Sequence, residues 1–273
     1  MQFGLSTYLF VEHRLGSHTL DQIHAAGFTR IEVFAARQHF DYHDPNHVRD
    51  VGQWFSDHGL SLHSLHAPIF GDSDWGRSGA PAISIAHLER RHRIESMDEI
   101  KRAIEVAETI PFRYLVLHLG VPNEEYDLRK FDAAFTSLEH LKIFSKERGA
   151  QLLLENTPNE LSTPERLVEF LQYTRLDLKL CFDTGHAHMV GGVRQAFQTL
   201  KDRIVSTHVH DNRRENDDHL MPFDGEINWE ETVRDFRAAS DQLPLVFELR
   251  DYGPEITTLP RVREIMQRME AIT

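Results

Sequence analysis

The chain has 273 residues, of which 40% are hydrophobic, enough to bury a substantial core and to exclude a largely disordered protein. Its formal net charge of -13 disfavours non-specific binding to nucleic acid or to an anionic membrane, because an acidic surface repels polyanions. The single cysteine, Cys181, excludes an internal disulfide.

Short β-rich runs alternate with longer amphipathic runs from one end of the chain to the other. The runs that predict strands are Phe3–Tyr8, Arg30–Phe34, Ser61–His66, Tyr114–Leu119, Gln151–Glu155, Lys179–Asp183, Ile204–His210 and Leu245–Leu249. Those that predict helices are Leu20–Ala26, His47–His58, Ile94–Thr109, Lys130–Arg148, Pro164–Tyr173, Val193–Leu200, Trp229–Ser240 and Pro260–Ile272. Several strand runs are apolar on both faces, as is typical of parallel strands covered by helices.

This alternation of strands and helices predicts one (β/α)8 TIM barrel, an α/β fold with a single domain over residues 1–273. A doubly wound open sheet is the alternative, but it normally has a glycine-rich phosphate turn after its first strand, and this chain has none. One connection, Gly71–His92, is long. Its Trp75 and the basic run Arg90–Arg93 predict either a lid that contacts an anionic substrate group or a solvated surface loop.

Residues that ligate metals end six consecutive predicted strands, the third to the eighth. These residues are His66, His118, Glu155, Asp183 with His186, His208 with His210, and Glu248. Because chemistry in such barrels lies at the C-terminal ends of the strands, we expect these side chains to share one rim. Their nitrogen and oxygen atoms suit Zn2+, Mn2+, Co2+ or Mg2+. A single histidine or glutamate at a strand end is more often structural, but six such ends predict a metal site.

The acidic strand ends Glu155, Asp183 and Glu248 follow apolar runs and would be costly to bury near one another. A bound divalent cation removes that cost. Without the cation we expect mutual repulsion, relieved in part by raised pKa values of the carboxyl groups.

Three stretches carry a resemblance to a known family: Cys181–His186, His208–Asn212 and Asp217–Trp229. Through these motifs the chain resembles, over essentially its whole length, the xylose isomerase-like TIM barrels. That family includes sugar and sugar-phosphate isomerases and epimerases, and also the endonuclease IV-type abasic-site nucleases. The resemblance implies a metal site formed by Glu155, Asp183, His208 and Glu248.

Two features of this implied site stay open. His208 is preferred to His210 because of its His-x-x-Asp spacing to Asp211, although both histidines point to the same side of a strand. The nuclease branch binds three ions, and the chain has matches for the additional ligands: His66 and His118 beside Glu155, and His186, Asp217 and His219 at another ion. We therefore expect one to three ions, with Zn2+ or Mn2+ favoured. In isomerase relatives some of these histidines contact substrate instead, and the Asp217–His219 pair is also compatible with a solvated turn.

The resemblance favours a sugar or sugar-phosphate isomerase or epimerase that transfers a proton through a metal-stabilised enediolate. Glu155 and Glu248 would be the catalytic pair that removes and returns the proton from opposite faces of the substrate. The expected substrate contacts are His186, His210, Trp75 and Arg214, with Arg213 as a competitor for the last role and a solvated turn as the alternative.

Two other functions remain as alternatives. An endonuclease IV-like phosphodiesterase with a di- or trinuclear zinc site would need a basic surface for DNA, whereas the candidate loop Phe34–Asp44 has one Arg against two Asp. A non-catalytic metal- or sugar-binding barrel would not need the paired Glu155 and Glu248. We expect a small-molecule partner, no membrane and a cytoplasmic location, since no signal peptide or membrane span is evident. The sequence leaves a homo-oligomer open.

Overall fold

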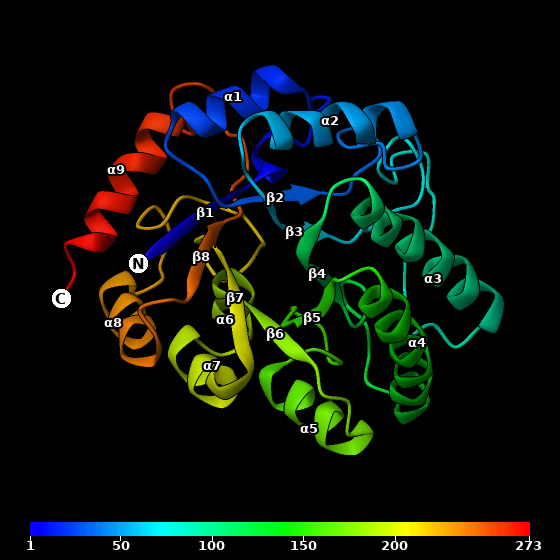
Figure 1. Cartoon of the computed structure of the whole chain (residues 1–273). Coiled ribbons are helices and arrows are strands. Elements are labelled where there is room, and N and C mark those ends of the chain that lie inside the picture. The colour runs from blue at the N-terminus through cyan, green and yellow to red at the C-terminus, as the bar shows by residue number, and fades with distance from the viewer.

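The computed structural model, which describes residues 1–273, is a closed barrel of eight parallel strands that pair in chain order, with β1 also paired to β8. The strands are β1 (Gln2–Ser6), β2 (Ile31–Phe34), β3 (Leu62–His66), β4 (Phe112–His118), β5 (Gln151–Glu155), β6 (Lys179–Asp183), β7 (Ile204–Val209) and β8 (Pro244–Phe247). Figure 1 shows the helices as an outer ring around these strands. The predicted (β/α)8 barrel is confirmed.

The ring and the barrel mouth contain more helices than the sequence predicted. The α-helices are α1 (Ser17–Ala25), α2 (Pro45–Asp57), α3 (Arg90–Glu105), α4 (Leu128–Glu147), α5 (Pro164–Thr174), α6 (Thr184–Val190), α7 (Val193–Leu200), α8 (Trp229–Ala239) and α9 (Leu259–Glu270). Three short 3-10 helices are η1 (Thr7–Phe10), η2 (Val106–Glu108) and η3 (Lys201–Arg203). None of the helices is long and apolar enough to cross a membrane.

The unpredicted helix α6 begins directly after β6 and lies inside the outer ring (Figure 1). The Asp183 carboxylate starts it by accepting a hydrogen bond from the His186 N–H at 2.7 Å, the arrangement of an N-cap. Because the cap is the last residue of the strand, no loop separates the two elements. The sequence gives little sign of this helix, which has only seven residues.

The first strand ends at Ser6, two residues before the predicted end. The Ser6 hydroxyl accepts a hydrogen bond from the Tyr8 N–H at 3.3 Å and begins η1. This turn brings the Tyr8 ring to the C-terminal end of the barrel, with its centroid 4.7 Å from that of the His219 ring.

The barrel interior and the layer outside it differ in polarity. A large apolar cluster lies between the sheet and the surrounding helices, whereas a separate cluster of only four buried residues contains Tyr114, Val116, Leu153 and Cys181. The middle of the barrel also holds polar side chains from three other strands: Glu32, Ser64 and Ser206 are fully buried. The apolar layer that holds the fold together is therefore the outer one.

Removing an aromatic ring from this outer layer should destabilise the fold strongly. Phe197 on α7 is 1% exposed, and its ring centroid lies 5.4 Å from that of Phe182 and 4.9 Å from that of Phe236. We expect Phe197→Ala to lower the free energy of unfolding by about 3–5 kcal/mol, because it leaves a cavity. Denaturant titration measures this free energy. Ile143→Ala, at a 62% exposed position on α4, is the control, and it should differ from the parent by no more than about 0.5 kcal/mol. Equal effects of the two substitutions would contradict this account of the core.

Candidate metal centre

The strand ends bring four ligand-type residues together, and one of them, the fully buried His208 of β7, lies among the other three. Its Nδ1 lies 3.0 Å from Glu155 Oε1, 3.4 Å from Glu248 Oε2 and 3.9 Å from Asp183 Oδ2. One ligand atom from each of these four residues lies within 4.8 Å of all the others. We call Glu155, Asp183, His208 and Glu248 the central set. They are the four residues that the family resemblance implied.

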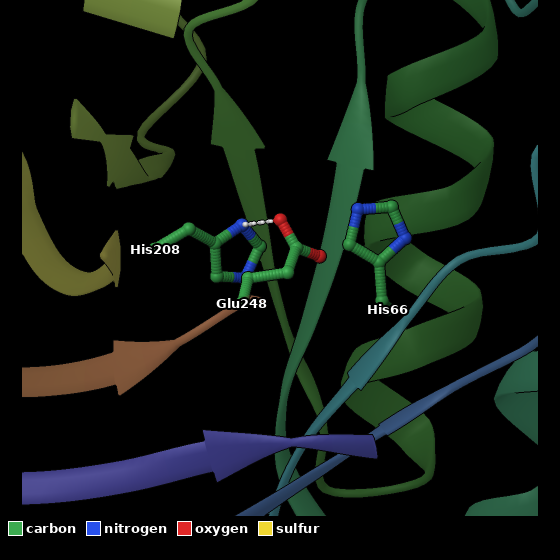
Figure 2. Close-up of side chains that lie close together, drawn as sticks. All are labelled: His66, His208 and Glu248. Atoms are coloured by element: carbon green, nitrogen blue, oxygen red, sulfur yellow. Dashed lines mark ion pairs between the residues drawn. The ribbon is translucent and has the colours of Figure 1, made fainter. Parts of the chain in front are cut away.

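Glu248 lies directly after β8 and also faces a fifth ligand-type residue. Figure 2 shows its carboxylate between the imidazole rings of His66 and His208, with the ion pair to His208 dashed. These three residues could hold a metal ion between them. Glu248 thus belongs to the central set and also lies beside His66 at the end of β3.

His66 and His118 form a second set with the other oxygen of Glu155. Glu155 Oε2 lies 3.4 Å from His66 Nε2 and 3.2 Å from His118 Nε2. Neither Glu155 Oε2 nor His118 Nε2 has a hydrogen-bond partner, although both atoms are buried. Ligand atoms about 2.0–2.2 Å from a tetrahedral ion are themselves about 3.4 Å apart. The spacing and the unpartnered atoms therefore fit a shared cation.

Asp217 joins two histidines in a third set, which we call the Asp217 set. Its Oδ2 lies 3.1 Å from His186 Nε2 and 3.1 Å from His219 Nε2, while its Oδ1 is buried without a hydrogen-bond partner. His210 lies on this side of the centre, with its Nε2 3.0 Å from Asp183 Oδ2 and 3.7 Å from Asp217 Oδ1. The geometry therefore favours His208 over His210 as the histidine of the central set.

Gly185 makes room for this position of His210. A Cβ atom at residue 185 would lie 2.0 Å from Cε1 of the His210 ring, closer than real contacts allow. Only glycine fits there, which explains one residue of the Cys181–His186 motif in physical terms.

Protons on the histidines balance the charge of the carboxylates in this structure. Burial raises the pKa of Glu155, but the charges of His208 and His118 outweigh burial and hold that pKa well below its usual range. Burial lowers the pKa of His219, yet the Asp217 carboxylate raises it to about 9. Asp183 and Asp217 likewise raise the pKa of His186 well above its usual value, against the effect of burial.

For Glu155 and Asp183 the expectation of raised carboxyl pKa values is therefore wrong in direction. The pKa values of Glu155, Asp183 and Asp217 are all lowered. The physical reason is that imidazoles lie beside these carboxylates, and those of His66, His186, His208 and His219 have raised pKa values, so that positive charge faces each carboxylate.

Glu32 in β2 is a buried member of the centre that the sequence analysis missed. Its Oε2 lies 3.2 Å from His208 Nε2 and accepts a hydrogen bond from the Ser64 hydroxyl at 2.7 Å. A carboxylate in this position accepts a hydrogen bond from the Nε2–H of His208 and leaves Nδ1 facing the central set. The signal in the sequence was a lone charge in an apolar strand, since all four residues of β2 are buried.

Asp211 anchors the loop that carries Asp217 and His219. It accepts hydrogen bonds from the Trp229 indole N–H at 2.7 Å and from the Ile227 N–H at 3.1 Å. A Cβ atom at Gly225 would lie 2.3 Å from Asp211 Oδ1, so this contact also needs glycine. The distant parts of the His208–Asn212 and Asp217–Trp229 motifs are thereby joined in one structural unit.

The two other predicted substrate contacts, Trp75 and Arg214, lie in different places relative to the centre. The Trp75 ring lies 6.1 Å from that of Tyr8 and 6.0 Å from that of Phe34, and Phe34 stacks on His66 at 4.6 Å. Trp75 therefore belongs to an aromatic group at the rim, of which the sequence analysis missed Tyr8 and Phe34.

Arg214 is not brought to the centre. It is exposed, has a φ of 70° and lines a hollow with His188 and Glu226 near the start of α7. Its competitor Arg213 donates a hydrogen bond to the Asp224 carbonyl at 3.3 Å. Neither arginine forms an ion pair or a side-chain hydrogen bond with a residue of the three sets.

Neutralising Glu32 should weaken metal binding without unfolding the protein. We expect Glu32→Gln to reduce affinity about 10- to 100-fold, because the variant loses the negative charge that supports His208 as a ligand. Competition with a chelator measures this. Glu99→Gln is the matched control, since Glu99 is a buried carboxylate that binds Tyr42 on the outside of the barrel. Unchanged affinity in Glu32→Gln would show that Glu32 has no such role.

Known proteins resemble the chain in sequence and in fold. The uncharacterized protein y4fM of Sinorhizobium fredii is 26% identical over 250 residues, which cover 85% of this chain and 80% of the relative. A probable endonuclease 4 of Natronomonas pharaonis is 26% identical over 199 residues, which cover 64% of this chain and 70% of the relative.

Solved structures show the same fold at lower identity. A D-tagatose 3-epimerase-like protein superposes with a TM-score of 0.79 at 23% identity, covering 100% of this chain and 98% of that one. The IOLI protein, described with a binding zinc atom, gives a TM-score of 0.77 at 16% identity, covering 99% of this chain and 96% of the other. The family described as xylose isomerase-like TIM barrel matches residues 20–272. The chain belongs to the xylose isomerase-like TIM barrel family.

Proposed function

We propose that the protein is a divalent-metal-dependent isomerase or epimerase of a sugar or sugar phosphate. The observation that carries this proposal is the position of two buried carboxylates on either side of one imidazole nitrogen. Glu155 and Glu248 lie 3.0 and 3.4 Å from His208 Nδ1 and come from strands on opposite sides of β7 in the barrel order. The shared fold with a D-tagatose 3-epimerase-like protein supports the same class of reaction.

The residues of the central set fit a divalent ion, which when bound supplies a Lewis acid that polarises a substrate carbonyl. Zn2+ or Mn2+ suits the mixture of imidazole and carboxylate ligands. The protein's own carboxylates move the proton. Glu248 forms ion pairs with two histidines, whereas Glu155 forms them with four: His66, His118, His186 and His208. Glu248 is thus the less neutralised base, and we assign proton removal to it and proton return to Glu155.

A sugar would reach this centre past the exposed members of the rim. The side chain of His118 is 23% exposed and that of Asp217 is 35% exposed, while the central set is almost fully buried. We assign substrate contacts to His186, His210 and Trp75, because they lie beside this opening or in its aromatic border. Arg214 would contact substrate only after a rearrangement of the loop that Asp211 anchors.

Removing either carboxylate should abolish turnover while the barrel stays folded. We expect Glu155→Gln and Glu248→Gln each to lose about 10²- to 10⁴-fold in rate, since each loses both a charged ligand and a proton carrier. NMR of ketoses and sugar phosphates in deuterated water, with metal-loaded protein, detects exchange of the substrate C–H proton. Glu99→Gln should retain the parent rate. Near-normal exchange in either active-site variant would contradict the paired-carboxylate mechanism.

A second candidate function, cleavage of a phosphodiester at an abasic site in DNA, is favoured by one specific observation. The Asp217 set and the second set around Glu155 Oε2 are both assembled, so the ligands for additional ions are in place. The similarity to a probable endonuclease 4 points the same way. The net charge of -13 opposes it, because the DNA backbone would be repelled.

Incubation with duplex DNA containing an abasic site separates the two candidates. At near-physiological salt we expect neither binding nor incision of the strand. Metal-dependent incision 5′ to the lesion that Asp217→Ala or His219→Ala abolishes would reverse the order of the candidates.

A further inference from the structure

The N-terminal mouth of the barrel, at the opposite end from the metal centre, contains a basic hollow. It is lined by residues at or near the starts of six strands, among them Gln2, Arg30, His63, Arg113 and Gln242. The metal ligands lie at the other ends of the strands. Nothing in the proposed function uses this face of the molecule.

Two guanidinium groups share this hollow without a carboxylate partner. Arg30 donates a hydrogen bond to the neutral Gln2 Oε1 at 2.7 Å, and the Arg113 guanidinium lies 4.9 Å from the centroid of the Tyr114 ring. Neither arginine forms an ion pair, and no Asp or Glu lines the hollow. Burial and the charge of Arg113 together lower the pKa of Arg30. Two like charges held together in a chain with 43 acidic residues lack their counter-ion.

Neutral hydrogen-bond donors border the two arginines. The Ser240 oxygen accepts a hydrogen bond from the Gln242 N–H at 3.1 Å, which leaves the hydroxyl proton free to donate. The Gln242 amide and the His63 imidazole line the same hollow. Guanidinium forks together with neutral donors match the several acceptor oxygens of an oxyanion.

We propose that this hollow binds the phosphate group of a small molecule. A phosphate group carries up to two negative charges and presents three or more oxygens, so it can engage both guanidinium groups, whereas a single carboxylate would satisfy one. A polyanionic macromolecule is disfavoured, because the net charge of -13 on the chain would repel it. The ligand is therefore inorganic phosphate or a small phosphate ester.

Thermal melting of the full-length protein tests this site, in metal-loaded form and after chelation. Potassium phosphate or glycerol 3-phosphate is compared with potassium chloride at equal ionic strength. We expect both forms to melt a few degrees higher with one or both phosphates, because ligand binding stabilises the folded state. Chelated protein excludes phosphate bound to an active-site ion, so this result does not depend on the proposed reaction. A shift with the ester identifies a metabolite as a source, and a shift with inorganic phosphate alone identifies the free ion.

Substitution of the two arginines tests whether phosphate binds in this hollow. Arg30→Gln/Arg113→Gln should lose the phosphate shift and, in chloride, should melt no lower than the parent because the repulsion between the two like charges is removed. Arg263→Gln, which removes an exposed arginine on α9, should keep the shift. If the double variant does not fold, Arg113→Gln alone serves, since Arg113 is exposed. A shift that persists without these arginines, or that chloride reproduces, would overturn the proposal.

Discussion

Charge balance at one rim of the barrel is the constraint on which the rest of the structure depends. Glu32, Glu155, Asp183 and Glu248 are at most 3% exposed, and burial of that much negative charge requires positive charge nearby. In the protein alone, protons on imidazoles supply it, as the raised pKa values of His186, His208 and His219 show. A divalent ion would replace those protons, and so the groups that stabilise the rim in the protein alone are the same ones that would ligate the proposed metal ion.

Because the strands are parallel, these groups lie together at the C-terminal end of the barrel, and a few residues then fix their orientation. Asp183 closes β6, caps α6 through the His186 N–H and contacts His210, so one carboxylate aligns two neighbouring histidines. Glu32 lies inside the barrel, where it takes the place of an apolar side chain and its carboxylate lies within hydrogen-bond distance of His208. The polar barrel interior and the candidate metal centre are therefore parts of one arrangement, which the apolar layer outside the sheet supports.

Periodicity predicted the fold because each strand is a short buried run between amphipathic helices. The same logic placed His66, His118, Glu155 and Asp183 at a common rim, since a residue at a strand end cannot avoid it. Contacts between distant elements were beyond such reasoning. Glu32 is a lone charge in an apolar strand, which marks it as unusual, but only the structure shows that its partner is His208.

Loop conformation accounts for the other differences between sequence and structure. Arg214 was expected to contact substrate on the basis of the family resemblance, but the loop fixed by Asp211 directs it outward. Tyr8 was assigned to a strand, yet η1 brings its ring beside His219. In both cases the side chain's position depends on a turn fixed by backbone N–H groups that donate to a side-chain oxygen, of Asp211 in one loop and of Ser6 in the other.

A melting series of chelated protein with added Zn2+, Mn2+, Co2+ or Mg2+ tests the charge-balance account most directly. The raised histidine pKa values contribute stability that is complete below about pH 6.5 and is lost as the pH rises through the folded-state values, about 9 for His219. At pH 7.5 at least one ion should raise the melting temperature by several degrees, corresponding to about 2.7 kcal/mol at a hundredfold excess over the dissociation constant. At pH 5.5 the rise should shrink, because more protons must be displaced from the histidines. If no ion shifts the transition at pH 7.5, and His208→Ala melts like the parent in their presence, the rim is not a metal centre.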